Sequence, residues 1–409
     1  MSTIAVLVTV NTKEQEALFL RDHIRAQGFD SCIIDVSTRD LGQGLTEYPW
    51  EEVSLKAGVP SEALLKMRRD DMMRTMGEGA AKILLDFYAK GELGGVISVG
   101  GNQGTAIAAI AMRALPIGVP KVIISTVASG QVRPYVEYRD IMMMFSVADF
   151  VNNVNVVNRT IMSNGVGAVM GMAKWGIPMR RSGLPVIATT AFGNTDASVS
   201  QARVLLEREG YEVVGFHASG AGGAALEYLV EQGYIQGVLD LTTHELLAGA
   251  CECGDIYTPL RPRLVDAGRL GIPQVVAPGA AEYFCFGPAE TIPVAMRERL
   301  THYHNPYNTN VRASVEEVTK TGKVMAERLN ASTGPVTLLL PTKGFSENGR
   351  KGGSLYQPAT DRVLIDVLKN EVASNVEVIE IDANINDKEF SSLAAGKMLG
   401  HMKNARGEK

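Results

Sequence analysis

Hydrophobic and polar positions follow one another along this chain in a pattern that predicts β-strands joined by amphipathic helices. The apolar run IAVLVTV at residues 4–10 predicts a buried strand, and residues 12–28 predict an amphipathic helix that ends at Gly28. Residues 29–37, FDSCIIDVS, predict the next strand. Because this alternation continues along the chain, we predict an α/β fold with mainly parallel sheets covered by helices on both faces.

The same order of elements returns 182 residues further along, in residues 184–220. Under this shift Arg21 falls on Arg203 and Gly28 on Gly210. A duplication would explain the match, and so would the similar helix ends that occur by chance in any α/β protein. Since Pro, Gly and two arginines interrupt the apolar pattern at residues 175–185, we predict two Rossmann-like subdomains, residues 1–182 and 183–409, with a ligand cleft between them.

The composition of the chain limits which binding partners and which cellular compartment we expect. The net charge of −5 and the absence of a Lys/Arg run argue against nucleic-acid binding. No stretch approaches the 18 or more apolar residues of a membrane helix, and the first residues do not resemble a signal peptide. Four cysteines in 409 residues do not form a disulfide framework, so we expect a cytoplasmic protein.

A glycine-rich turn follows the predicted strand within GGVISVGGNQGTAIAAIAMRAL, residues 94–115. Gly100, Gly101 and Gly104 leave main-chain N–H groups accessible at the start of a helix, where the helix dipole also favours an anion. Asn102 lies between the glycines, and Thr105 could cap the helix or touch a phosphate. A plain strand-to-helix turn needs fewer glycines, so the pattern favours a bound ligand.

A second turn of this kind lies at residues 217–229, HASGAGGAALEYL. Gly220, Gly222 and Gly223, with Ser219 before them, could form a second anion-binding nest that faces the first. His217 stands at the end of the preceding strand, where either a structural or a functional histidine fits. One phosphate-rich ligand held by both turns would explain the two patterns together.

The segment LDLTTHELL, residues 239–247, follows another predicted strand. Thr242 and Glu245 have capping-box spacing, which by itself explains them, while Thr242 and Thr243 are also candidates for contacting a cofactor. Asp240, His244 and Glu245 could serve Mg²⁺ binding or acid/base chemistry if they point into the cleft.

Two later segments carry further candidates. His304 and Arg312 lie in HYHNPYNTNVRASVEE; a metalloprotease-type histidine pair is absent, and Arg312 could clamp a carboxylate or phosphate. Lys343, Arg350 and Lys351 lie in LLLPTKGFSENGRKGG, which lacks the Lys-Ser/Thr pair of a Walker A motif and could instead form a mobile lid. A solvated loop is the alternative. No serine has the setting of a G-x-S-x-G elbow.

Eight motifs taken in order resemble one known family, and the similarity covers nearly the whole chain. They include VGGNQGTAIA, FGNTDASV, FHASGAGGAALE, LDLTTHEL and HNPYNTNVR. The chain is similar to the family of the ATP-binding amino-terminal domain of the tomato protein that inhibits tobamovirus replication, with bacterial and fungal homologues. The resemblance implies two Rossmann-like subdomains, bound ATP and self-association. Asn102, Gln103, Ser219 and His244 differ from the residues usual in that family.

These observations lead to one functional hypothesis and two alternatives. We expect a protein that binds ATP with Mg²⁺ and, as an enzyme, acts on a small acidic or sugar-like metabolite, with Asp240 or Glu245 sharing the metal. The first alternative is a nucleotide- or anion-binding regulator without turnover. The second is an ATP-independent lyase or isomerase that uses His217, Glu245 and His304 as acid/base groups. We expect a homodimer or higher homo-oligomer.

Overall fold

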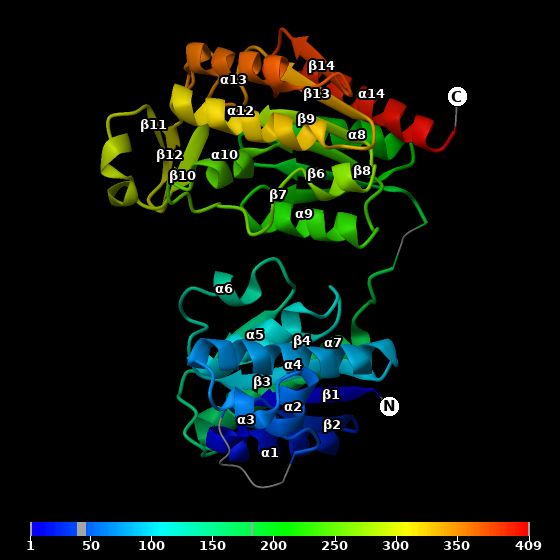
Figure 1. Cartoon of the computed structure of the whole chain (residues 1–409), viewed down its shortest axis with the longest axis vertical. Coiled ribbons are helices and arrows are strands. Elements are labelled where there is room, and N and C mark those ends of the chain that lie inside the picture. Colours follow the sequence, from blue (N-terminus) through cyan, green and yellow to red (C-terminus); the bar gives the residue numbers. More distant parts are fainter. Residues whose placement is uncertain (1, 39–45, 181–182, 408–409) are drawn as a thin grey trace. The chain divides into compact units, whose positions relative to one another are not determined.

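The computed structural model describes residues 2–38, 46–180 and 183–407 of the chain. Its internal contacts divide the chain into two compact units, residues 1–180 and 181–409, which we call the N-terminal and the C-terminal unit. Each unit contains a parallel sheet with helices on both faces (Figure 1).

The N-terminal unit is built on a five-stranded sheet in which all neighbouring strands are parallel, in the order β2-β1-β3-β4-β5. The strands are β1 (Thr3–Val8), β2 (Asp30–Asp35), β3 (Leu93–Gly100), β4 (Lys121–Ser125) and β5 (Met142–Phe145). The helices are α1 (Val10–Ala26), α2 (Trp50–Lys56), α3 (Ser61–Leu64), α4 (Arg69–Ala89), α5 (Asn102–Arg113), α6 (Arg133–Val136) and α7 (Val156–Trp175).

The first strand shows why its sequence is apolar without interruption. All six residues of β1 are buried. Ile4 and Val6 belong to the core that packs against α1 and α7, whereas Ala5 and Leu7 belong to the core under α4 and α5. Because successive side chains point to opposite faces, a strand covered on both sides needs apolar residues at every position.

The C-terminal unit is built on a six-stranded parallel sheet in the order β14-β13-β9-β8-β6-β7, with a three-stranded antiparallel sheet, β10-β12-β11, inserted after β9. The strands are β6 (Val186–Ala191), β7 (Glu212–His217), β8 (Gly237–Thr242), β9 (Gln274–Gly279), β10 (Tyr283–Phe286), β11 (Thr301–Asn305), β12 (Asn308–Arg312), β13 (Val336–Pro341) and β14 (Val376–Ile381). The helices are α8 (Asp196–Arg208), α9 (Ala221–Glu231), α10 (His244–Cys251), α11 (Asp266–Arg269), α12 (Val315–Asn330), α13 (Pro358–Glu371) and α14 (Lys388–Ala405), with 3₁₀ turns η1 (Ala289–Thr291) and η2 (Val294–Met296).

The predicted α/β class with two Rossmann-like parallel sheets is confirmed. The first five parallel strands of each unit follow the same spatial order: β2-β1-β3-β4-β5 corresponds to β7-β6-β8-β9-β13. This shared topology agrees with a duplicated unit. The prediction that one ligand is held between the two halves stays a prediction, and the pockets described below each lie within one unit.

Both sheets reverse their strand order at one point, between β1 and β3 in the N-terminal unit and between β6 and β8 in the C-terminal unit. The loops after the two strands at such a point diverge to opposite faces of the sheet and leave a crevice at its carboxyl edge. A ligand site is therefore expected after β1 and β3, and another after β6 and β8.

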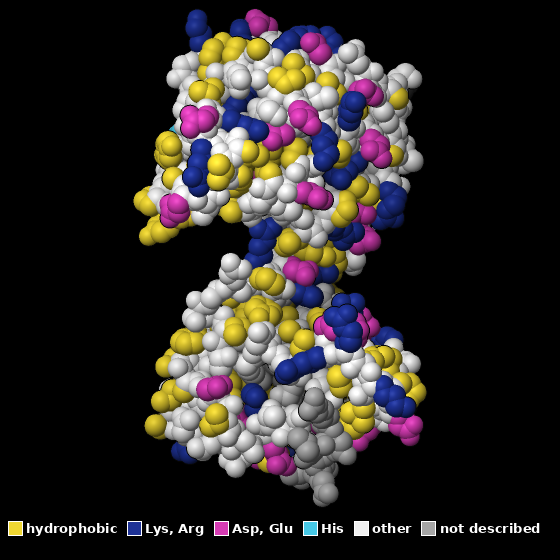
Figure 2. Space-filling model, turned by 60° about the vertical axis from the view of Figure 1, so that its left-hand side comes forward, with side chains coloured by type: hydrophobic (Ala, Val, Ile, Leu, Met, Phe, Trp, Pro, Cys, Tyr) yellow, Lys and Arg dark blue, Asp and Glu magenta, His cyan; other side chains and the backbone are white. Residues whose placement is uncertain are grey.

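The helices, the surface charges and the cysteines can be compared with the expectations from composition. None of the helices in the described ranges combines the length and the apolar character needed to cross a membrane. On the face shown in Figure 2, Lys and Arg side chains lie interspersed with Asp and Glu side chains over both units. The four cysteines Cys32, Cys251, Cys253 and Cys285 are free thiols.

Candidate functional site

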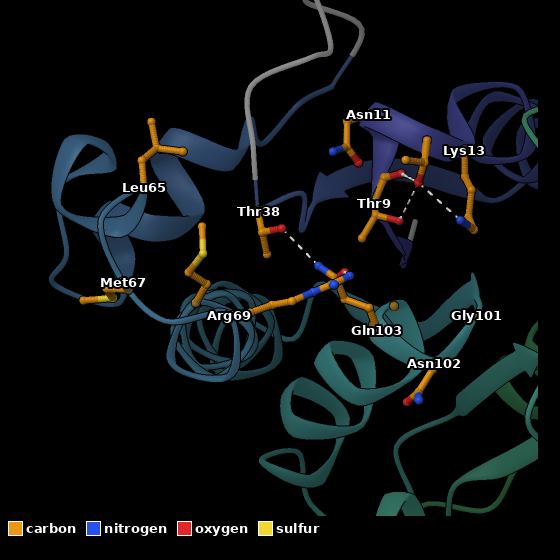
Figure 3. Close-up of a pocket in the computed structure, with 13 residues that line it drawn as sticks. Thr9, Asn11, Lys13, Thr38, Leu65, Met67, Arg69, Gly101, Asn102 and Gln103 are labelled. Atoms are coloured by element: carbon orange, nitrogen blue, oxygen red, sulfur yellow. Dashed lines mark hydrogen bonds between the residues drawn. The ribbon is translucent and has the colours of Figure 1, made fainter.

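A cavity of about 880 Å³, which we call the N-terminal pocket, opens at the carboxyl ends of β1 and β3 (Figure 3). It lies where the strand order of this sheet reverses. The pocket is lined by Thr9, Asn11, Thr12, Lys13, Thr38, Leu65, Met67, Arg69, Met72, Gly101, Asn102, Gln103 and Gly104. Its volume lies within the roughly 300–1,000 Å³ of typical small-molecule sites.

The first glycine-rich turn forms one wall of this pocket. Gly101 is the N-cap of α5, and no side chain caps the first turn of this helix. A Cβ at Gly100 would lie 3.1 Å from Gly104 Cα, so the close approach of β3 and α5 favours glycine at this position. A Cβ at Gly101 would meet nothing nearer than Thr126 Oγ1 at 3.6 Å. Packing therefore accounts for Gly100, whereas Gly101 keeps the uncapped helix end open toward the pocket.

Two cationic side chains lie beside this helix end. Arg69 Nη2 donates to Gln103 Oε1 at 2.7 Å, and Gln103 Nε2 donates to Thr38 Oγ1 at 3.0 Å (Figure 3). Lys13 Nζ donates to Thr12 Oγ1 at 3.2 Å. Within the described part of the chain, neither Arg69 nor Lys13 pairs with a carboxylate. Their charges and the dipole of α5 add to a positive potential in the pocket.

The start of α1, which also borders the pocket, is satisfied internally. Val10 N donates to Asp35 Oδ1 at 3.1 Å, and Asn11 N donates to Ser37 Oγ at 3.1 Å. Burial raises the pKa of Asp35, while hydrogen bonds from Ser37 and Val10 act in the opposite direction. Of α1 and α5, α5 therefore offers the freer amide groups to an anion.

Asn102 and Thr105, the other predicted residues of this turn, have side chains that bond to neighbouring residues of the same unit. The side chain of Asn102 points away from Gln103 in Figure 3, and its Oδ1 accepts a hydrogen bond from Tyr135 Oη at 3.2 Å. Thr105 is fully buried, with Oγ1 2.6 Å from Ser125 Oγ. Gly101, Asn102 and Gly104 line the pocket, and the two glycines can present only main-chain atoms to it.

Sequence reasoning missed the other polar residues of the pocket. Thr9, Asn11, Thr12 and Lys13 begin directly after the apolar run of β1, and this position after a buried strand was a usable signal. Arg69 begins α4, far from any strand end, and gave no such signal.

The second glycine-rich turn contacts an internal anion. The N–H groups of Gly220 and Gly223 donate to Glu245 Oε1 at 2.5 and 3.1 Å. A Cβ at Gly222 would lie 1.9 Å from His217 O, so this glycine permits the close approach of β7 and α9. Ser219 Oγ donates to His217 O at 3.4 Å. These amides already serve a carboxylate of the same unit, and their contact with a phosphate stays a prediction.

A buried ionic network holds the residues proposed to bind Mg²⁺. Arg263 donates to Glu245 Oε2 at 2.5 Å, to Glu227 Oε1 at 2.6 Å and to Asp240 Oδ2 at 2.7 Å. All four side chains are at most 2% exposed. In the portions of the chain that are described, no three His, Cys, Asp or Glu residues gather as a metal site would require. Asp240 and Glu245 therefore do not fit a Mg²⁺ site: Arg263 and Thr190 bind the oxygens of Asp240, and Arg263 and the glycine amides bind those of Glu245.

The neighbouring threonines are also held inside the unit. The hydroxyls of Thr242 and Thr195 lie 2.8 Å apart, and Thr243 Oγ1 donates to Ala277 O at 3.0 Å. Thr243 is the N-cap of α10, and no side chain caps this helix. The capping box predicted from the spacing of Thr242 and Glu245 is wrong, because Glu245 turns to Arg263 instead.

Arg312 and Lys343 have their own partners within the C-terminal unit. Arg312 is buried and donates to Asp361, with a further bond to Leu355 O at 3.2 Å. Lys343 Nζ lies 2.9 Å from Asp382 Oδ2. Together with Arg350 and Lys351, Lys343 lines a separate cavity of about 350 Å³ in the C-terminal unit.

A smaller cavity of about 160 Å³, which we call the C-terminal pocket, brings together two of the three predicted acid/base residues. It is lined by Phe192, Gly193, Asn194, His217, Tyr257, Tyr283, Cys285, His304, Asn308, Asn310 and Asn348. His217 and His304 line it, whereas Glu245 does not. Its asparagines and tyrosines were not singled out from the sequence, because they come from segments far apart along the chain.

His244 lies behind this pocket. Its Nε2 is 3.2 Å from Asp255 Oδ2, and its Nδ1 is 3.0 Å from Ala280 O. Burial disfavours the charged form of His244, but the Asp255 carboxylate outweighs it and raises the His244 pKa well above its ordinary value. His244 and Asp255 form a buried pair next to Cys285, whose thiol pKa is raised by burial.

Two domains of one protein family match the chain. The N-terminal domain of the uncharacterised protein family UPF0261 matches residues 2–177, and the C-terminal domain of the same family matches residues 184–402. The chain belongs to the UPF0261 family. The two matched domains correspond to the two structural units. The family matches and the tomato relative described below confirm the family resemblance seen in the motifs.

Relatives within and beyond bacteria share nearly the whole chain. A UPF0261 protein of Clostridium tetani is 39% identical over 405 residues, which are 98% of both chains. A UPF0261 protein of Rhizobium meliloti is 34% identical over 399 residues, 96% of this chain and 98% of the relative. The ToMV resistance protein Tm-1(GCR237) of Solanum lycopersicum is 34% identical over 432 residues, 96% of this chain and 54% of the tomato protein.

Proposed function

We propose that the N-terminal pocket binds the phosphates of a nucleotide, ATP, and that this UPF0261 protein is an enzyme that uses ATP on a small metabolite. The carrying observation is the uncapped N-terminus of α5 at Gly101, beside two cations, Lys13 and Arg69, that pair with no carboxylate in the described ranges. A helix end and free cations together favour a multiply charged anion.

The expected binding energies explain why Lys13 and Arg69 matter for ATP affinity. Charge-assisted hydrogen bonds contribute about 1.5–3 kcal/mol each, and immobilising the ligand costs roughly 4 kcal/mol or more. Four such bonds from main-chain amides would leave about 2–8 kcal/mol, which corresponds to dissociation constants from tens of millimolar to about micromolar. Contacts from Lys13 and Arg69 would tighten this binding further.

We assign Mg²⁺ to the nucleotide rather than to Asp240 or Glu245. Thr9, Asn11, Thr12 and Thr38 offer hydroxyl and amide oxygens to the pocket, and no described lining residue is a carboxylate. Mg²⁺ commonly keeps several waters and is bound largely through substrate phosphates. The ion would therefore enter with ATP, and these oxygens would help to orient the complex.

The test is a calorimetric titration of the full chain with ATP and Mg²⁺. In Gly101→Val the new side chain occupies the open helix end, and Gly101 has an extended backbone that valine adopts, so the protein should fold but bind ATP at least about tenfold more weakly. Gly167→Val is the matched control, because Gly167 is exposed on α7 and a Cβ there would meet no heavy atom within 4 Å. Unchanged ATP affinity in Gly101→Val would defeat the proposal.

Turnover separates an enzyme from a regulator that binds ATP. Incubation with ATP, Mg²⁺ and a panel of sugars, sugar acids and amino acids should yield ADP, AMP or pyrophosphate with at least one of them. Saturable ATP binding without product from any compound would favour the regulatory alternative.

We also propose a cytoplasmic location and self-association. The free state of all four cysteines is compatible with a reducing compartment. Self-association rests on the family resemblance. Fractionation of cells and light scattering of the purified chain test the two statements separately.

A further inference from the structure

We propose that the C-terminal pocket binds a small, uncharged, polyhydroxylated molecule such as a sugar or polyol. The proposal rests on three residues that line one cavity, Tyr257, Tyr283 and Asn194, whose side chains keep two unused O–H donors and one unused acceptor among the described residues. It is independent of nucleotide binding, because these residues all belong to the C-terminal unit.

Two tyrosine hydroxyls of the pocket each accept a hydrogen bond from an asparagine. Asn194 Nδ2 donates to Tyr283 Oη at 2.6 Å, and Asn308 Nδ2 donates to Tyr257 Oη at 3.3 Å. Burial raises the pKa of both phenols, so each keeps its proton at neutral pH. Since each oxygen already accepts, each O–H is available to donate to a ligand oxygen in the pocket.

The matching acceptor is Asn194 Oδ1. This atom is buried and has no hydrogen-bond partner within the described parts of the chain. The main-chain oxygen of Asn194 accepts from Glu347 N at 2.9 Å and from Asn386 Nδ2 at 2.8 Å, so the residue is held in place. A buried acceptor without a partner costs about 1–3 kcal/mol, and a ligand hydroxyl that reached Asn194 Oδ1 from the pocket would remove that cost.

The walls favour a neutral ligand. None of the described lining residues is Lys, Arg, Asp or Glu, and the titratable side chains among them are His217, His304, Tyr257, Tyr283 and Cys285. The ring centroids of Phe192 and Tyr257 lie 5.6 Å apart and give the pocket an apolar face beside its amides. A molecule with C–H faces and vicinal hydroxyls, which both donate and accept, complements this combination.

The size sets a limit on the ligand. A cavity of about 160 Å³ corresponds to roughly five waters at about 30 Å³ each. Glycerol, erythritol, xylitol, ribose and myo-inositol form a suitable probe panel, with malate and inorganic phosphate as anionic counterparts.

Two variants of the full chain test the site. Gly193→Leu adds a bulky side chain at the pocket wall, since Gly193 lines the pocket and a Cβ there meets no heavy atom within 4 Å. Tyr257→Phe removes one hydroxyl and keeps the ring. The matched controls are Gly396→Leu, at an exposed position of α14 with equally open space, and Tyr303→Phe, at a side chain that is 69% exposed.

Calorimetry and ligand-observed NMR with each probe give the outcome. At least one polyol should bind the wild-type chain at millimolar concentration or below. Gly193→Leu should abolish that binding, Tyr257→Phe should weaken it about three- to tenfold, and both controls should leave it unchanged. The proposal is overturned if no polyol binds, if the anions alone bind, or if Gly193→Leu binds like wild type. ATP affinity, measured on the same samples, should not change in Gly193→Leu.

Discussion

Arg263 Nε donates a hydrogen bond to Glu245 Oε2 at 2.5 Å, with both side chains at most 1% exposed. The other oxygen of the same carboxylate accepts the N–H groups of Gly220 and Gly223. One glutamate thus ties α10, the second glycine-rich turn and Arg263 together. Because Asp240 and Glu227 pair with the same guanidinium, this cluster holds three carboxylates around one cation.

We predict that Arg263→Met strongly destabilises the C-terminal unit. Removal of the guanidinium leaves three buried carboxylates without their partner, which should lower the free energy of unfolding by about 3–5 kcal/mol. Urea unfolding of the full chain measures this change. Arg269→Met is the control, since Arg269 is 54% exposed and its loss should cost less than about 1 kcal/mol. Equal stability of the two variants would contradict a structural role for the network.

We predict that alanine destabilises the protein at Gly222, in the second glycine-rich turn, but not at Gly101, in the first. In Gly222→Ala the new Cβ would lie 1.9 Å from His217 O, so β7 and α9 must separate and the free energy of unfolding should fall by about 1–3 kcal/mol. In Gly101→Ala the nearest atom would be 3.6 Å away, and stability should stay within about 0.5 kcal/mol of wild type. Thermal unfolding of both variants checks the contrast, and a stable Gly222→Ala would be the contrary result.

We predict that Arg69→Gln weakens ATP binding by about ten- to a hundredfold. Arg69 reaches the wall of the N-terminal pocket without a carboxylate partner in the described ranges, so its charge is available to a phosphate. Arg68→Gln is the control, because the adjacent Arg68 pairs with Asp70 and is 81% exposed. The loss should shrink as ionic strength rises, and equal ATP affinity in the two variants would exclude Arg69 from the site.

We predict that Glu282 makes stability depend on pH. Burial raises the pKa of Glu282 to about 7 despite the nearby Arg312, and its Oε2 has no hydrogen-bond partner among the described residues. A folded-state pKa above the unfolded value of about 4.5 means that the protonated group stabilises the fold fully below about pH 4.5, and that this contribution is lost as pH rises to about 7. This difference between the folded and unfolded pKa corresponds to about 3 kcal/mol in the free energy of unfolding.

Glu282→Gln mimics the protonated carboxyl and should remove this dependence. Chemical unfolding of wild type and Glu282→Gln between pH 5 and about 8 gives the difference, which should grow in favour of the variant as pH rises. Glu290→Gln, at an exposed position of the same unit, should show no such trend. Parallel curves for wild type and Glu282→Gln would contradict the raised pKa.

The pattern of apolar residues was sufficient for the fold class. A strand such as β1 is apolar at every position because both faces of its sheet are covered, and a helix such as α1 follows at once, so periodicity alone indicates parallel α/β units. The recurrence of strand, helix and strand after 182 residues likewise agrees with the shared strand order of the two units. Such features depend on neighbours in sequence, which a single chain displays.

The partners of polar side chains were decided by tertiary structure. The sequence shows similar glycine-rich turns at residues 100–104 and 220–223, yet in the structure Glu245 binds the amides of the second turn and no side chain caps the helix after the first. Arg263, which fixes Glu245, stands 18 residues further along the chain and carries no local signal. Hydrogen bonds and ion pairs act over a few ångströms in space, so their partners are chosen by the packing of distant segments and not by spacing along the chain.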